Sequence, residues 1–195
     1  VNKANQIMGV IRRSFKYMDE RIFSLLYKSM VRPHLEYGNV IWHPNKVKLI
    51  DLIENVQRRA TKQVPGLGNL PYEDRLKKLK LPTMSYRRLR GDMIELYKMS
   101  HDMYDPALPS LMRIAVTNTR GHPYKIEHQR FKKAVRQNFL TVRSAQPWNS
   151  LPTSVVTAPT LNTFKNRLDR TWKQLDLLHD YKAYPTGGTK WPGEM

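Results

Sequence analysis

The feature that most constrains the fold is a stretch of apolar residues at helical spacing that runs from residue 21 to residue 64. Steps of three and four residues place apolar side chains on one side of a helix. In the first half of the stretch these residues are Ile22, Leu25, Leu26, Met30 and Leu35. In the second half they are Leu49, Ile53, Val56 and Ala60. We expect both stripes to be buried, with the short turn at 43–45 making the two helices antiparallel neighbours.

Similar periodicity predicts further helices along the chain. One covers residues 2–15, a short one covers 72–81, a long one starts at Thr83, and Thr160 caps the last one. Pro33 falls inside the first apolar stripe, where its missing N–H predicts a kink.

The C-terminal third carries a different pattern. Residues 124–128 and 135–142 are enriched in β-branched and aromatic residues, which predicts a small β-hairpin with a basic tip. Trp148 follows in a turn between Pro147 and Pro152, and we expect its ring to dock on the core.

These patterns predict a mainly α fold, a helical bundle with the small β-hairpin in its C-terminal third. We expect the bundle to cover residues 1–104 and a linker or variable loop to cover 105–123. A C-terminal extension with the hairpin and the final helix is expected at 124–178. The Gly- and Pro-rich tail, 179–195, is expected to be disordered.

The charge balance narrows the possible partners. The chain has 34 Lys+Arg against 16 Asp+Glu, a formal net charge of +18, which favours a polyanion and above all nucleic acid. It shows neither a lipidation motif nor an apolar run long enough to span a bilayer, so we expect no membrane partner. There is no cysteine, which is typical of an intracellular protein, nuclear or cytoplasmic. The chain opens at Val1 without an initiator methionine, as expected of a fragment.

Basic residues cluster on three consecutive predicted helices. From residue 58 to residue 90 there are ten Lys and Arg against two acids, Glu73 and Asp74. Like charge on a compact domain is destabilising unless a partner relieves it, and a phosphate backbone would do so. The candidates for this phosphate-facing surface are Arg58, Arg59, Lys62, Arg87, Arg88 and Arg90. A second candidate surface is the hairpin tip with Lys132, Lys133 and Arg136. Aromatic side chains near these clusters, which could stack on bases, are Tyr72, Tyr86 and Phe131.

The sequence shows no constellation typical of catalysis. Tyr72-Glu73-Asp74 is similar to the aromatic-acid pair that binds metal in polymerases, but Pro71 before it and lysines after it indicate acids at a helix start. The six histidines include no pair at i, i+4, and no nucleophile-elbow glycine pattern is present. We therefore predict no catalytic residue and no metal ligand here, and an autonomous enzyme with an unrecognised site is the third-ranked interpretation.

Four blocks occur in an order and at spacings that resemble a known family. They are LLYKSMVRPHLEYGNVIW, LIENVQRRATKQV, YEDRLKKLKLPTMSYRRLRGDMIELYKM and NFLTVRSAQPWNSLPTSVVTAPTLNTFKNRLDRTW. Together they resemble the C-terminal part of the reverse transcriptase of non-LTR (LINE-type) retrotransposons of the Jockey and chicken-repeat kind. The resemblance covers about residues 1–175.

The resemblance implies a thumb subdomain and a C-terminal extension that grip template RNA and primer DNA beside the fingers and palm of the same parent polymerase. In the family, palm carboxylates hold the Mg²⁺ ions of polymerisation, and those carboxylates are not in this chain. No catalytic residue and no cofactor can therefore be carried over. A stand-alone nucleic-acid-binding module, either domesticated or degenerate, is the alternative interpretation.

Overall fold

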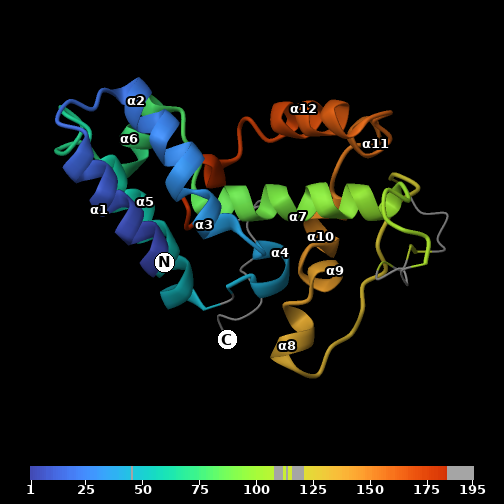
Figure 1. Ribbon diagram of the computed structural model, residues 1–195. Coiled ribbons are helices and arrows are strands. Elements are labelled where there is room, and N and C mark those ends of the chain that lie inside the picture. The colour runs from blue at the N-terminus through green and yellow to red at the C-terminus, as the bar shows by residue number, and fades with distance from the viewer. Residues whose placement is uncertain (45, 108–111, 113, 116–120, 184–195) are drawn as a thin grey trace. The chain divides into compact units, whose positions relative to one another are not determined.

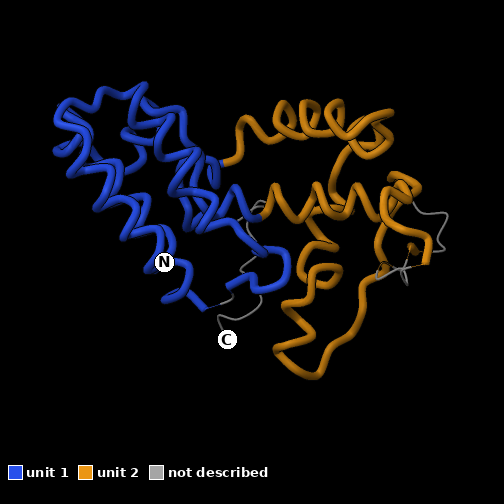
Figure 2. Tube along the Cα trace, in the orientation of Figure 1, with its two compact units in different colours: residues 1–88, 176–183 blue, residues 89–175, 184–195 orange. Residues whose placement is uncertain are grey.

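The computed structural model describes residues 1–44, 46–107, 112, 114–115 and 121–183, and within them the chain is mainly helical, as predicted (Figure 1). It divides into two compact units (Figure 2). Of the described residues, unit 1 holds 1–88 and 176–183, and unit 2 holds the remainder between 89 and 175. The boundary falls inside one helix, α7 (Met84–Ser100). The predicted domain division after residue 104 stays a prediction.

Unit 1 is built mostly of helices that each bury one face. Its elements besides the start of α7 are α1 (Asn2–Ser14), α2 (Glu20–Leu26), the π-helical turn η1 (Tyr27–Val31), α3 (Pro33–Glu36), α4 (Asn39–Trp42), α5 (Val47–Thr61), α6 (Tyr72–Leu79) and the 3₁₀ turn η2 (Asp176–Leu178). The core side chains of α5 are Ile53, Val56 and Ala60, as the sequence predicts, but Leu49 of the predicted stripe is 45% exposed because the first turn of α5 lies outside the core. Asp19 caps α2, since its Oδ1 accepts the N–H of Ile22 at 2.7 Å.

The apolar stripe predicted for the first half of the 21–64 stretch is right at Leu35, which is buried, and wrong in phase before it. The buried residues there are Phe23, Tyr27 and Val31, whereas Leu25 is 67% exposed and Met30 44% exposed. The buried face continues through η1, in which the N–H of Arg32 donates to the Tyr27 carbonyl five residues back, at 2.9 Å.

Pro33 is accommodated by the same turn. It stands at the first position of α3, and Arg32 before it keeps right-handed helical angles. A proline is tolerated at a first helical position because its missing N–H has no helical partner there. The chain therefore passes from α2 through η1 into α3 without leaving a helical conformation.

Unit 2 packs short helices around an aromatic core. Its elements besides the greater part of α7 are α8 (Ala134–Gln137), α9 (Leu140–Arg143), α10 (Ala145–Asn149), α11 (Thr153–Val156) and α12 (Leu161–Thr171). Trp148 docks in this core with no exposed surface, and its Nε1–H donates to the Tyr124 carbonyl at 2.7 Å. Thr160 caps α12, as predicted, by accepting the N–H of Thr163 at 3.2 Å.

The predicted β-hairpin is wrong. Residues 135–142 lie in α8, α9 and the link between them, and Ile126 forms only an isolated antiparallel bridge with Ile114. An isolated two-stranded hairpin is marginally stable in water, and β-propensity depends strongly on context. The helical form lets α9 bury Leu140 and Thr141 in unit 2. Burial in the unit thus overrides local preference.

Part of the predicted linker and tail lies outside the described residues, namely 108–111, 113, 116–120 and 184–195. The first residues of the predicted tail, 179–183, belong to unit 1. Over the described ranges, no helix has the length and apolar character needed to cross a membrane.

Candidate nucleic-acid interface

Arg58, the first residue of the predicted phosphate-facing surface, is held inside unit 1. Its guanidinium carbon lies 5.3 Å from the ring centre of Tyr72 and 5.2 Å from that of Tyr181, so it stacks on both rings. Its Nη2 donates to the Tyr181 hydroxyl at 2.9 Å, and Tyr181 in turn donates to Asp51 at 2.9 Å. Arg58 thus fastens the segment after η2 to α5. Its polar contacts serve the fold.

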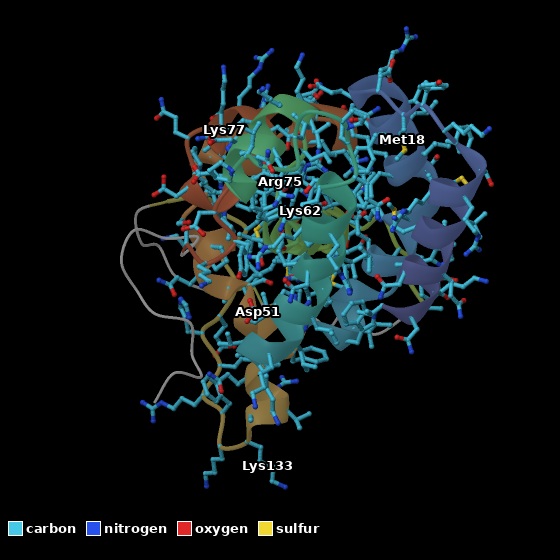
Figure 3. The ribbon with its side chains drawn as sticks, turned by 90° about the vertical axis from the view of Figure 1, so that its left-hand side faces the viewer. Met18, Asp51, Lys62, Arg75, Lys77 and Lys133 are labelled. Carbon is cyan, nitrogen blue, oxygen red and sulfur yellow. The ribbon has the colours of Figure 1, made fainter. Side chains whose placement is uncertain are left out.

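Arg59 and Lys62, the other two predicted residues of α5 and its C-cap, are exposed. Arg59 makes two long hydrogen bonds of 3.3 Å, to the Asn55 carbonyl and to Asn5 Oδ1. Figure 3 shows Lys62 at the end of α5 that adjoins Arg75 of α6. Both side chains are placed where a solvent-borne phosphate can reach them.

A hollow of 310 Å³ lies beside Lys62 and extends along the turn to Asn69. It adjoins the C-terminal end of α5, where the helix dipole carries partial negative charge and disfavours an anion. We therefore assign no phosphate site to this hollow.

The three arginines of α7 are engaged by other parts of the fold. Arg87 forms a bidentate pair with Glu36 at 2.7 and 2.8 Å, and Arg90 forms one with Asp169 at 2.6 and 2.8 Å. Arg88 is 1% exposed and donates to Ser85 Oγ at 3.0 Å. Although they form a dense basic run in the sequence, Arg87 and Arg90 are already paired with carboxylates, and Arg88 is buried. Their role in phosphate binding stays a prediction.

The cations of the second predicted surface are exposed, unlike Arg58 and the three arginines of α7. We call residues 130–136 the basic segment. It leads into α8, whose N-cap is Lys133. Its cations are all exposed: Arg130, Lys132, Lys133 and Arg136. Figure 3 shows Lys133 at the outer end of α8, pointing away from the ribbon.

Arg136 is the one cation of the basic segment with a well-defined local partner in the described structure. Its guanidinium carbon lies 4.8 Å from the ring centre of Phe139, and it donates to Gln129 Oε1. Neither partner is charged, so the positive charge is oriented without being neutralised. The acid before the segment is Glu127, three residues ahead of Arg130, and the next acid after it is Asp169, so the segment itself contains no carboxylate.

Tyr72, Glu73 and Asp74 do not form a metal site. Tyr72 donates its hydroxyl hydrogen to Glu54 at 2.6 Å, while Glu73 pairs with Lys77 at 3.0 Å along α6. That hydrogen bond to Glu73 raises the pKa of Lys77. Glu73 and Asp74 therefore lie in the first turn of α6, as predicted. Across the residues that the structure describes, no three His, Asp or Glu side chains are grouped as metal ligands would be.

Sequence reasoning missed a buried carboxylate, Glu54, which organises the centre of unit 1. It has no exposed surface, and besides the Tyr72 hydroxyl it accepts the N–H of Met84 at 3.0 Å. Burial is the main cause that raises the pKa of Glu54. The carboxylate caps the start of α7. No local sequence pattern indicates this role, because the partners of Glu54 lie 18 and 30 residues away.

Comparison with known proteins adds little. No protein-family model matches the chain, and no solved structure matches it. One curated relative is an uncharacterized protein of Caenorhabditis elegans that is 29% identical over 80 residues, a match that covers 40% of this chain and 40% of that protein.

Proposed function

We propose that this chain binds nucleic acid through its phosphate backbone. In line with its sequence resemblance, it would serve as the thumb and C-terminal extension of a non-LTR retrotransposon reverse transcriptase, gripping template RNA and primer DNA. Its partners would then be the RNA/DNA hybrid and the fingers and palm of the parent polymerase, which would hold the Mg²⁺ ions. The observation that carries the proposal is the basic segment, with four exposed cations in a stretch, 128–168, that contains no acid.

The physical argument rests on charge that the fold leaves uncompensated. Arg87 and Arg90 are paired with carboxylates, so binding a phosphate would require breaking a pair that already exists. Lys132 and Lys133 have no carboxylate partner among the described residues, and a phosphate can take the place of their counterions. Release of those counterions is what drives sequence-independent binding to a nucleic acid. The helical fold of the described residues is compatible with a thumb.

Replacing Lys132, Lys133 and Arg136 together by alanine is expected to weaken binding to an RNA/DNA hybrid and to flatten its salt dependence. Each lost phosphate contact lowers the slope of log K against log[salt] by about 1, so we expect the slope to fall by about 2–3. Fluorescence anisotropy with a labelled hybrid at several KCl concentrations measures both quantities.

The matched control removes three cations from another part of unit 2. Lys165, Arg170 and Lys173 lie on or just after α12, which Figure 1 shows at the opposite end of this unit from α8. Their replacement by alanine changes the net charge by the same amount and is expected to leave the slope near that of the wild type. Equal effects of the two triple variants would mean that only net charge matters, and the basic segment would lose its assignment.

The polymerase part of the proposal has its own test, the genomic reading frame upstream of Val1. An open frame that encodes an aromatic-x-Asp-Asp turn between apolar strands supports a parent reverse transcriptase. A start codon or stop codons directly upstream would contradict it and favour the stand-alone module.

A further inference from the structure

Phe131 is exposed in the middle of the basic segment. The residue is 43% exposed, and its neighbours in the chain are Arg130 and Lys132. A single exposed apolar side chain is ordinary on a protein surface. Here, however, Phe131 stands in a segment that has four exposed cations and contains no acid, so a polyanion drawn to the segment arrives beside it.

Phe131 differs in its surroundings from the two other aromatic residues near basic clusters. The Tyr72 ring is covered by Arg58 and Arg75, with guanidinium carbons 5.3 and 5.4 Å from its centre, and its hydroxyl is bound to Glu54. Tyr86 is 5% exposed and belongs to the core. Of the three, Phe131 is the one that is exposed, whereas Tyr72 is half-buried and Tyr86 buried.

We propose that Phe131 stacks on an unpaired nucleobase while Arg130, Lys132 and Lys133 contact the flanking phosphates, so that the basic segment prefers single-stranded RNA or DNA to a duplex. The inference rests on the proposed function: phosphate contacts are common to the RNA/DNA hybrid and to single strands, and stacking adds affinity for the single strand alone. In a duplex, neighbouring base pairs cover both faces of each base. An unpaired base exposes its π-face whatever the sequence, and stacking on a protein ring is favourable for all four bases.

The test replaces Phe131 in the full 195-residue chain by alanine, leucine and tryptophan. Loss of one stacked base predicts roughly tenfold weaker binding of a single-stranded oligonucleotide by the Phe131→Ala variant. The Phe131→Leu variant keeps an apolar side chain but has no π-face, so it should be weakened as well. The Phe131→Trp variant should keep the wild-type affinity. Because the ring carries no charge, the salt slope should not change in any of them.

Two further measurements identify the contact. Single strands that carry 2-aminopurine should lose fluorescence on binding the wild-type chain, since stacking quenches this base, and should lose less with Phe131→Ala. RNA and DNA strands of the same sequence should respond alike, because the base is common to both, and a blunt duplex should bind wild type and Phe131→Ala equally.

The outcomes separate the inference from the proposed function. If Phe131→Ala binds single strands as tightly as wild type while the Lys132/Lys133/Arg136 variant is weakened, the stacking inference is overturned and phosphate binding stands. An equal loss for single strand and duplex would also overturn it, because the ring would then serve the fold of the segment. If neither variant changes binding, both proposals fall.

Discussion

Replacing Asp92 by alanine is expected to lower the free energy of unfolding by about 3–5 kcal/mol. Asp92 is 1% exposed and accepts two hydrogen bonds from Arg143, at 2.7 and 3.0 Å, and one from Ser144 Oγ at 3.3 Å. The side chain of Arg143 is itself only 6% exposed. Removing the carboxylate takes two charge-assisted hydrogen bonds from a cation that water cannot readily reach, and that penalty dominates. Denaturant unfolding followed by circular dichroism measures the change.

The control for this prediction removes the cation as well. Replacing Asp92 by alanine and Arg143 by methionine leaves a cavity but no unpaired charge, so the double variant should recover part of the stability that Asp92→Ala loses. A loss below about 1 kcal/mol for Asp92→Ala would mean that the pair is as weak as a surface ion pair, contrary to its burial.

Replacing Glu54 by alanine is the second change with a large expected effect, about 3 kcal/mol of unfolding free energy. Glu54 accepts hydrogen bonds from the Tyr72 hydroxyl and from the N–H of Met84, both inside unit 1. Without the carboxylate, two donors in the core of unit 1 lose an acceptor, and α7 loses the group that caps its start. The same unfolding measurement tests this. A variant within about 0.5 kcal/mol of wild type, the range usual for surface changes, would contradict the role of Glu54.

The control variant Glu54→Gln separates the charge of this side chain from its shape. Because burial raises the pKa of Glu54 in the folded state, the folded chain binds this proton more tightly than the unfolded chain does. The contribution of the group is therefore greatest below its unfolded pKa of about 4.3 and is lost as the pH rises through the folded pKa. Glutamine does not titrate, so the stability of Glu54→Gln relative to wild type should rise with pH across that window. A difference that stays constant with pH would contradict the raised pKa.

The helices of the fold could be predicted where local spacing decides them. Ile53, Val56 and Ala60 of α5 are buried at the predicted helical steps, and Asp19 and Thr160 cap helices because their side chains accept nearby N–H groups. The phase of α2 could not be predicted, because Ile22, Leu25 and Leu26 recur at helical steps just as Phe23 and Tyr27 do, and only packing decides which face is buried. The hairpin failed for another reason, since α9 gains more from burying Leu140 than a short strand pair could offer.

The candidate interface was predictable only where charge has no distant partner. Arg87 and Arg90 looked available in sequence, yet the carboxylates that bind them, Glu36 and Asp169, lie 51 and 79 residues away. A local count of charges cannot detect such pairing. The basic segment could be found because its four cations lie within seven residues that contain no acid, and all four are exposed.

The most direct test of the account is the affinity of the unmodified chain for an RNA/DNA hybrid, measured between about 50 and 200 mM KCl. Phosphate binding predicts that log K falls linearly with log[salt], with a slope that the Lys132/Lys133/Arg136 variant reduces and the Lys165/Arg170/Lys173 variant does not. An affinity that does not change over this range, or no binding at the lowest salt, would contradict the central claim that this chain is a phosphate-binding module.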